Sequence, residues 1–253
     1  FNWRLPLVYQ VVGILGLGPA RVLLVAVALV LVVRAGGLLG WGVVGLLAMV
    51  NATLMMGAPY GPYLTELWAG AFLGLSALAY AQRRDGAGVG WALLALLTRE
   101  LAAPYCVVAA GIALWRRRWR EVAAWVIGAA AYGVYYGWHV WQASRHIRPD
   151  DVAHAASWLR WGGIPFLLET WRYDGLFLIA PRPIFALSVG GVGVAAWAPR
   201  MPLHVRTRVV AYALFCLAIG QPFNAYWGFL TAPLIALWLG YAPAGLRVLW
   251  ASR

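Results

Sequence analysis

The sequence has few charged residues and no lysine. Only 11% of its 253 residues are charged, and all 20 basic residues are arginine, against 8 acidic ones. Soluble globular domains carry about 25% charged residues, so this scarcity excludes an ordinary water-soluble domain. The net charge of +12 does not indicate nucleic-acid binding either, because the arginines form short clusters between apolar runs and not one basic face.

Cysteines and soluble-enzyme motifs are also scarce. The two cysteines, Cys106 and Cys216, lie far apart inside apolar runs, which excludes a disulfide framework or a thiolate metal cluster. No combination of serine, histidine and aspartate has the pattern of a soluble hydrolase, and no dinucleotide fingerprint is present. We therefore predict no cofactor.

Long apolar runs dominate the sequence, and 63% of the residues are hydrophobic. About 20 helical residues cross a hydrocarbon core, and unpaired backbone groups leave only helices or closed barrels in lipid. Because the runs are continuous and do not alternate, we predict an all-α, polytopic transmembrane bundle that forms one domain over residues 1–253, with about eight to nine membrane segments. The predicted spans are 20–33, 38–56, 63–82, 88–115, 122–141, 183–197, 209–220 and 226–241. A shorter run, 7–18, is expected at the membrane interface.

The arginine clusters predict the orientation of these helices, because short cytoplasmic loops collect arginine and lysine. Twelve arginines share one side in this arrangement, against two acidic residues there, Asp85 and Glu121. These arginines are Arg34, Arg83, Arg84, Arg116, Arg117, Arg118, Arg120, Arg200, Arg206, Arg208, Arg247 and Arg253. We predict that this side is cytoplasmic.

The segment 86–115 predicts a hairpin inside the membrane. Arginines flank it on both sides, so it must cross an even number of times, and we expect short helices at 88–97 and 101–114. The hinge between them contains Arg99 and Glu100, which would lie near the outer boundary of the membrane. Ionisable residues at such a depth mark a functional site by default. The alternative is a snorkelling pair whose members only satisfy each other.

Glu66 is a third ionisable residue at this predicted depth. It follows Thr65 at the start of a helix, so its carboxylate could simply complement the helix N-terminus. The functional alternative is that Glu66 faces Arg99 and Glu100 across the bundle.

The hydrophilic stretch 143–174 predicts one longer extracytoplasmic loop, with its tryptophans as interface anchors. It contains Arg145, Arg148 and Arg172. Arginine matches the geometry of phosphate, and tryptophan stacks on sugar faces. This composition is compatible with a ligand that carries sugar and phosphate.

A metal site in the same stretch is not predicted. His146, Asp150 and His154 have the i, i+4, i+8 spacing that could place ligands on one helix face. Pro149 interrupts such a helix.

Three GxxxG pairs predict close contacts between helices. They are Gly36 with Gly40, Gly70 with Gly74, and Gly133 with Gly137.

Three short motifs in residues 1–120 occur in a recognisable order. They are Trp3-Arg4 before Pro6, Thr65-Glu66 at a helix start, and Thr98-Arg99 between two short helices. In this order they resemble bacterial members of the GT-C superfamily, which are polytopic glycosyltransferases that use polyprenyl-phosphate sugars and include mannosyltransferase-like proteins.

The resemblance implies transfer of a sugar from a polyprenyl-phosphate donor to an acceptor at the extracytoplasmic face of a bacterial inner membrane. It assigns Arg99 to the donor phosphate and Glu66 and Glu100 to positioning Arg99 or binding substrate. Outer-loop contacts to phosphate or sugar are expected from Arg145, Arg148 and Arg172. The acidic catalytic motif of the superfamily precedes the aromatic-Arg element, so we expect it upstream of Phe1, in a longer gene product.

A different class of function is also open. The chain could be a non-enzymatic accessory or scaffold subunit that packs against membrane proteins and lipid. A transporter is less favoured, because the sequence has no convincing internal repeat.

Overall fold

All regular structure in the described residues is helical. The computed structural model describes residues 4–40, 42–147 and 160–252, and within them it contains α-helices and short 3-10 helices but no strand. The α-helices are α1 (Leu7–Leu15), α2 (Leu17–Leu39), α3 (Val43–Thr53), α4 (Thr65–Ala81), α5 (Asp85–Thr98), α6 (Ala103–Trp115), α7 (Trp119–Ser144), α8 (Gly163–Arg172), α9 (Arg182–Ala195), α10 (Leu203–Ala218), α11 (Gly228–Leu239) and α12 (Ala242–Ala251). The 3-10 helices are η1 (Leu54–Gly57), η2 (Gly61–Tyr63), η3 (Glu100–Ala102), η4 (Gly175–Leu178) and η5 (Pro222–Trp227). The prediction of an all-α protein is confirmed.

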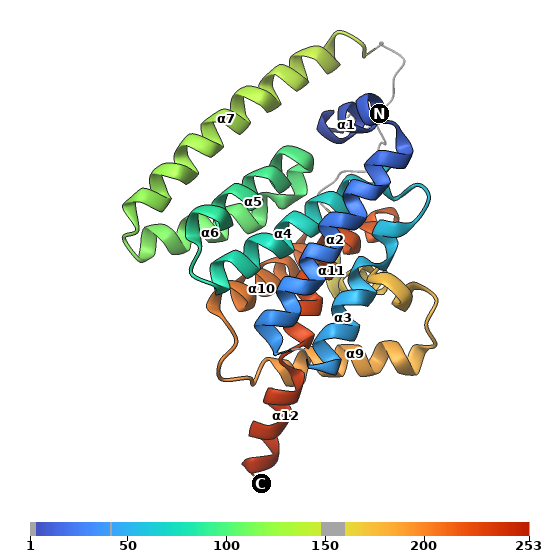
Figure 1. Ribbon diagram of the computed structural model, residues 1–253, viewed down its shortest axis with the longest axis vertical. Helices are drawn as coiled ribbons and strands as arrows, with labels where there is room; N and C mark the ends of the chain where they lie inside the picture. The colour runs from blue at the N-terminus through green and yellow to red at the C-terminus, as the bar shows by residue number, and fades with distance from the viewer. Residues whose placement is uncertain (1–3, 41, 148–159, 253) are drawn as a thin grey trace.

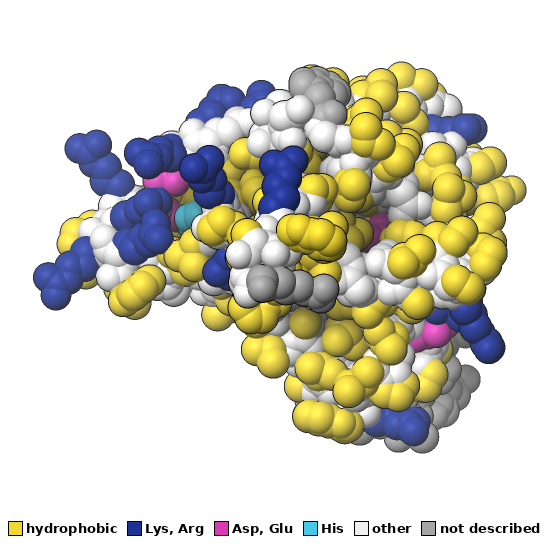
Figure 2. All heavy atoms as spheres, turned by 90° about the horizontal axis from the view of Figure 1, so that it is seen from below, with side chains coloured by type: hydrophobic (Ala, Val, Ile, Leu, Met, Phe, Trp, Pro, Cys, Tyr) yellow, Lys and Arg dark blue, Asp and Glu magenta, His cyan; other side chains and the backbone are white. Residues whose placement is uncertain are grey.

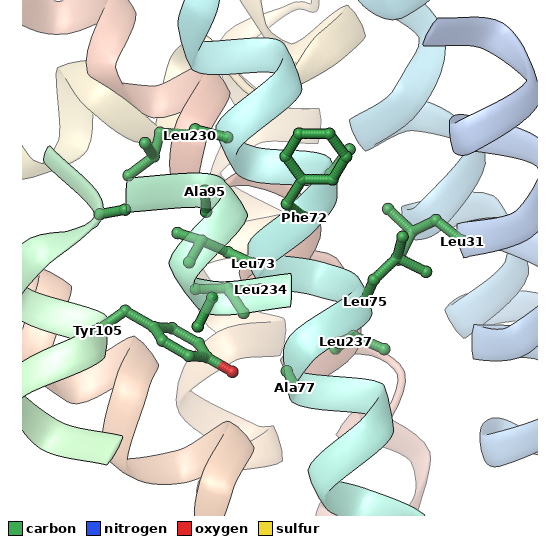
Figure 3. Close-up of a cluster of buried hydrophobic side chains, with 14 of the residues drawn as sticks. Leu31, Phe72, Leu73, Leu75, Ala77, Ala95, Tyr105, Leu230, Leu234 and Leu237 are labelled. Carbon is green, nitrogen blue, oxygen red and sulfur yellow. The ribbon is translucent and has the colours of Figure 1, made fainter. Parts of the chain in front are cut away.

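Helix α4 forms the centre of the packing. It contacts α2, α5, α10 and α11, and nearly all of its side chains are buried. Figure 1 shows α4, α5 and α6 side by side, α7 running along their outer side, and α12 projecting from the body toward the C-terminus. In Figure 3, Phe72, Leu73 and Leu75 of α4 lie among side chains of α2, α5, α6 and α11.

Length and composition identify few membrane-spanning helices in the described part of the chain. Helix α2 is long and apolar enough to cross a membrane alone. The helices at 222–239 and 242–251, which are bent by 41° at their junction, would be a second span if they cross together. Four further apolar helices are shorter, at 43–57, 85–98, 100–115 and 182–195.

The predicted break between two short helices is confirmed. Helix α5 ends at Thr98, and α6 begins at Ala103. Between them Arg99 has an extended backbone, with φ −151° and ψ 122°, and Pro104 occupies the first turn of α6, where a missing N–H group costs nothing.

Several predicted boundaries are wrong for identifiable reasons. The predicted interfacial run 7–18 is divided at Gly16, whose φ of 81° ends α1, so that Gly18 belongs to α2. The predicted span 38–56 is divided at Gly40, whose left-handed backbone ends α2.

The predicted loop 143–174 contains a helix. Helix α8 packs against α10 and buries Phe166 and Thr170. A short amphipathic helix that contributes only two buried residues gives a weak pattern in the sequence, which is why the loop prediction missed it.

Two turns at one end of the bundle are rich in arginine. They are the α4–α5 turn at 82–84 and the α6–α7 turn at 116–118, and we call this region the arginine end. The opposite end, where α4 begins and α5 ends, we call the site end. Both turns carry a left-handed arginine, Arg83 with φ 59° and Arg117 with φ 55°. This conformation costs an L-residue roughly 1–2 kcal/mol, and glycine adopts it without that cost.

We expect Arg83→Gly and Arg117→Gly each to raise the free energy of unfolding by roughly 0.5–1 kcal/mol, because relief of strain exceeds the entropy that glycine adds to the unfolded chain. The measurement is denaturant unfolding in detergent. Arg116→Gly is the control, since Arg116 has a φ of −84° and no such strain to lose. Equal effects of all three substitutions would contradict the prediction.

Candidate functional site

Four charged side chains of alternating sign form a continuous row at the site end. Nη1 of Arg4 lies 3.1 Å from Oε2 of Glu66, and Nε of Arg99 lies 3.0 Å from Oε1 of the same carboxylate. Nη1 of Arg99 lies 2.7 Å from Oε1 of Glu100. We call Arg4, Glu66, Arg99 and Glu100 the charge row.

The middle of the charge row is buried, and its two ends reach the surface. The side chains of Glu66 and Arg99 are 0% and 2% exposed, whereas those of Arg4 and Glu100 are 22% and 38% exposed. An unpaired charge in such an environment is strongly destabilising, so each buried member depends on its neighbours. The row is therefore neutral inside and presents a cation at one end and an anion at the other.

Each member is placed by a break or an end in a helix. Glu66 lies in the first turn of α4, directly after Thr65, whose hydroxyl bonds to the Glu66 carboxylate at 3.2 Å. Arg99 lies in the extended break between α5 and η3. Glu100 begins η3, and Arg4 precedes α1.

Arg4 joins the N-terminal segment to the last third of the chain. Its Nη2 donates to the Tyr226 hydroxyl at 3.2 Å, and its Cζ lies 5.5 Å from the centre of the Tyr226 ring. Burial lowers the pKa of Arg4. The Glu66 carboxylate and the hydroxyls of Tyr226 and Tyr9 together raise this pKa by more than burial lowers it, so the pKa lies above its ordinary value. Arg4 is a permanent cation held in a fixed position.

A cavity of about 560 Å³ begins at Arg4 and extends between α1 and the end of α7. Its other lining residues are Pro6, Tyr9, Gln10, Trp138, His139, Gln142, Ala143 and His146. The lining combines one cation, two amides, two imidazoles and two aromatic rings, which are groups able to bind phosphate and sugar. We call this space the α1–α7 cavity.

The other end of the charge row borders an apolar groove of about 510 Å³ between α6 and α10. Its lining residues are Glu100, Leu101, Ala103, Pro104, Val107, Val108, Ala211 and Phe215. The charge row thus borders a space at each end: Arg4 lines the α1–α7 cavity, and Glu100 lines the apolar groove.

The predicted proximity of Glu66 and Arg99 is confirmed by their ion pair, whereas Glu100 joins them only through its own ion pair with Arg99. Two other predicted site residues, Arg145 and Arg172, make no ion pair with the charge row. Arg145 is exposed and stacks on Trp141, with its Cζ 3.5 Å from the ring centre.

Arg172 lies on α8 and makes no ion pair within the described residues. Arg148 lies outside the described residues, as do Asp150 and His154 of the rejected metal pattern. Among the described residues, no group of three potential metal ligands comes together.

Arg4 and Tyr226 are members of the site that the sequence did not single out as site residues. Arg4 was visible as part of the Trp3-Arg4 motif, but its ion pair with Glu66 spans 62 residues and leaves no local pattern. Tyr226 is 222 residues from Arg4 and had no signal beyond its place at the start of an apolar run. Of the cavity residues on α7, Trp138 and His139 fall in the predicted span 122–141 and Ala143 falls in the predicted loop 143–174, so the sequence did not group them.

No family model matches the chain, and comparisons with curated proteins and with solved structures give no match. Residue chemistry and geometry therefore carry the functional inference.

Proposed function

We propose that the protein is a polytopic membrane glycosyltransferase that moves a sugar from a polyprenyl-phosphate donor to an acceptor hydroxyl at the extracytoplasmic face. The observation that carries this proposal is the charge row, which fixes the guanidinium of Arg4 in the wall of the α1–α7 cavity. Trp138 and Tyr9 in the same wall offer aromatic faces for a sugar.

The proposed setting is a bacterial inner membrane, with about eight to nine segments that cross or enter it. Large apolar side chains are exposed along α2, α3, α7 and α9, for example Val22, Leu47, Val134 and Leu187. Figure 2 shows hydrophobic side chains over much of one face, with one group of arginines at the left and further arginines spread around the edge. Such surfaces are favourable against lipid tails, and arginine-rich turns favour the cytoplasmic side.

In this setting α5 and α6 form a hairpin too short to span twice. Their 14 and 13 residues give helices of about 20 Å, less than the roughly 30 Å of a hydrocarbon core. The Arg99 break then lies within the outer part of the membrane, where a charge is retained only with partners. Glu66 and Glu100 are those partners.

The geometry favours Arg4 over Arg99 as the phosphate ligand. The resemblance had assigned the donor phosphate to Arg99, but its side chain is only 2% exposed and is paired with two carboxylates. Arg4 is more exposed and lines the cavity. We therefore assign Arg4 to the phosphate and Arg99 to holding Glu66, which in turn holds Arg4.

In the reaction, the acceptor oxygen bonds to the anomeric carbon while the bond from that carbon to the phosphate oxygen breaks. The phosphate leaves with the electron pair, and a nearby fixed cation stabilises the developing charge. The hydroxyl proton passes to a base, a role that we assign to no residue of this chain.

The test is transfer of a radiolabelled sugar from polyprenyl phosphate by the full chain in nanodiscs. Removal of one preorganised donor of this kind lowers kcat by roughly a hundredfold or more, and we expect that loss for Arg4→Gln. Arg21→Gln is the matched control, because Arg21 is an exposed arginine of α2 outside the cavity lining and should leave transfer unchanged.

Full activity of Arg4→Gln would overturn the assignment of Arg4. The alternative, an accessory subunit, is tested by copurification with other membrane proteins. Stable copurification, together with no transfer from any polyprenyl-phosphate sugar, would overturn the proposed enzymatic function and favour an accessory subunit.

A further inference from the structure

A second polar cavity lies where α8 packs against the end of α10. Its volume is about 420 Å³, and it shares no lining residue with the charge row or with the α1–α7 cavity. The residues around it that carry the argument are Arg160, Trp161, Phe166, Glu169, Gly220 and Pro222. We call this space the α8 cavity.

The α8 cavity lies at the site end. The Tyr212 hydroxyl donates to the backbone oxygen of Leu101 at 3.0 Å, which brings the second half of α10 beside η3. Pro222 in the cavity wall begins η5, which also contains Tyr226, and the Tyr226 hydroxyl accepts a hydrogen bond from Arg4. A 3-10 helix rises about 2 Å per residue, so the cavity wall and this partner of Arg4 are separated by about 8 Å along η5.

The floor of the α8 cavity is held by close backbone contacts. The N–H group of Gly220 donates to the backbone oxygen of Arg160 at 2.9 Å. A Cβ atom added at Gly220 would collide with the Phe166 ring, and one added at Gly162 would collide with the backbone oxygen of Cys216. Both glycines therefore allow α8 to approach α10. A floor that is fixed before a ligand arrives reduces the ordering cost of binding.

Three exposed side chains in the cavity lining combine an aromatic face with charged hydrogen-bonding groups. Trp161 is 74% exposed, and a Cβ atom added at Gly163 would lie 3.4 Å from its Nε1, so the edge of the indole rests against the backbone. Arg160 and Glu169 are also exposed, and neither makes an ion pair with another described residue. The guanidinium supplies donors, and the carboxylate supplies acceptors.

A sugar ring matches this lining better than a charged ligand does. One side of a pyranose carries C–H groups that suit an aromatic face, and its hydroxyls both donate and accept hydrogen bonds. Hydrogen bonds to ionised partners are the stronger ones. An anion would be repelled by Glu169 and a cation by Arg160, so the pair favours a neutral ligand with several hydroxyls.

We propose that the α8 cavity binds a neutral saccharide, with one ring stacked on Trp161 and its hydroxyls bonded to Arg160 and Glu169. Because only one short helix separates this cavity from the partner of Arg4, we assign it to the acceptor of the transfer reaction. The acceptor is then an oligosaccharide, since a second ring must present its hydroxyl near Arg4. The acceptor role rests on the glycosyltransferase proposed above, whereas saccharide binding does not depend on it.

The binding test uses the full chain, labelled with fluorotryptophan, in phosphatidylcholine nanodiscs. Fluorine NMR follows the Trp161 signal, assigned by its loss in Trp161→Phe, while mannobiose, maltose or lactose is titrated without any donor. Mannitol is the control ligand, because it carries hydroxyls but no ring. We expect at least one disaccharide to shift the Trp161 signal and mannitol to leave it unchanged. No shift with any disaccharide, or an equal shift with mannitol, would overturn the site.

Two variants of exposed side chains test the contacts and leave the buried floor intact. In calorimetric titrations we expect Trp161→Ala and Glu169→Gln each to weaken disaccharide binding by roughly tenfold, through loss of the aromatic face and of a charge-assisted hydrogen bond. Trp250→Ala is the matched control, because Trp250 is 76% exposed on α12, outside the cavity lining. Equal weakening by Trp161→Ala and Trp250→Ala would contradict stacking on Trp161.

Transfer assays separate the acceptor role from the transferase itself. With the disaccharide that binds as acceptor, we expect Trp161→Ala to raise KM for the acceptor by roughly tenfold and to leave KM for the polyprenyl-phosphate donor unchanged. An unchanged KM for the acceptor would overturn the acceptor role. Disaccharide binding without any transfer would instead overturn the proposed transferase and support a saccharide site alone.

Discussion

Replacing Arg99 with glutamine is expected to lower the free energy of unfolding by roughly 3–5 kcal/mol, because it removes the charge that compensates a buried carboxylate. Glu66 is fully buried, and Arg99 is its most buried ionic partner, at 3.0 Å. Glu66→Gln should have an effect of similar size, since it leaves Arg99 without its buried partner. Denaturant unfolding in detergent measures both.

The double variant Glu66→Gln with Arg99→Gln distinguishes the loss of the ion pair from unrelated destabilisation at each position. If the two charges compensate each other, the double variant should lose much less stability than the sum of the single variants. Asp85→Asn is the matched control, because Asp85 pairs with Arg118 where both side chains are about one third exposed, and Arg118 keeps its second partner, Glu121. Exposed pairs contribute roughly 0–1 kcal/mol, so Asp85→Asn should change little. Strict additivity in the cycle would show that Glu66 and Arg99 do not depend on each other.

Gly70→Ala is expected to destabilise the protein by roughly 1–3 kcal/mol or more, because a single added methyl group must push two helices apart. A Cβ atom at Gly70 would lie 2.6 Å from the backbone oxygen of Phe229 and 2.9 Å from that of Leu230 on α11. Backbone atoms cannot move aside as a flexible side chain does. The α4–α11 contact lies at the centre of the bundle, so thermal unfolding in detergent should detect the loss directly.

Gly133→Ala is the control for the same substitution in an open position. A Cβ atom at Gly133 of α7 would meet nothing within 4 Å. Alanine has a higher helix propensity than glycine, so this variant should gain up to roughly 1 kcal/mol. Loss of stability in Gly133→Ala equal to that in Gly70→Ala would contradict the packing argument.

The two glycine positions show what a motif alone can predict. Gly70 and Gly133 each begin a GxxxG pattern, and the sequence predicted a close contact between helices at each of them. The prediction is confirmed for Gly70 and Gly74, whose added Cβ atoms would clash, but it is wrong for Gly133 and Gly137, which have open space beside them. It is also wrong for Gly40, which has no close neighbour and ends α2 with a left-handed backbone. Spacing places two glycines on one face of a helix, but whether another helix occupies that face depends on the whole packing.

Some contacts of the charge row were also predictable from the sequence, and others were not. The break at Arg99 was predictable, because arginine-rich flanks and the length of the apolar run required a hairpin. The contact of Glu66 with Arg99 followed from equal depth in that arrangement. The contact of Arg4 with Glu66 and Tyr226 was not predictable, since residues 62 and 222 positions apart meet only after the helices have packed.

The sequence by itself determined the helical class, the hairpin at Arg99 and the arginine end, because these depend on local hydropathy, on helix-breaking residues and on the spacing of charges. The tertiary structure alone decided that Arg4 rather than Arg99 lines a cavity and that α8 packs where a loop was expected. The physical reason is that burial and ion pairing depend on which helix faces meet, and a chain so rich in apolar residues offers many faces that could meet. Close packing and the cost of an unpaired buried charge select among them.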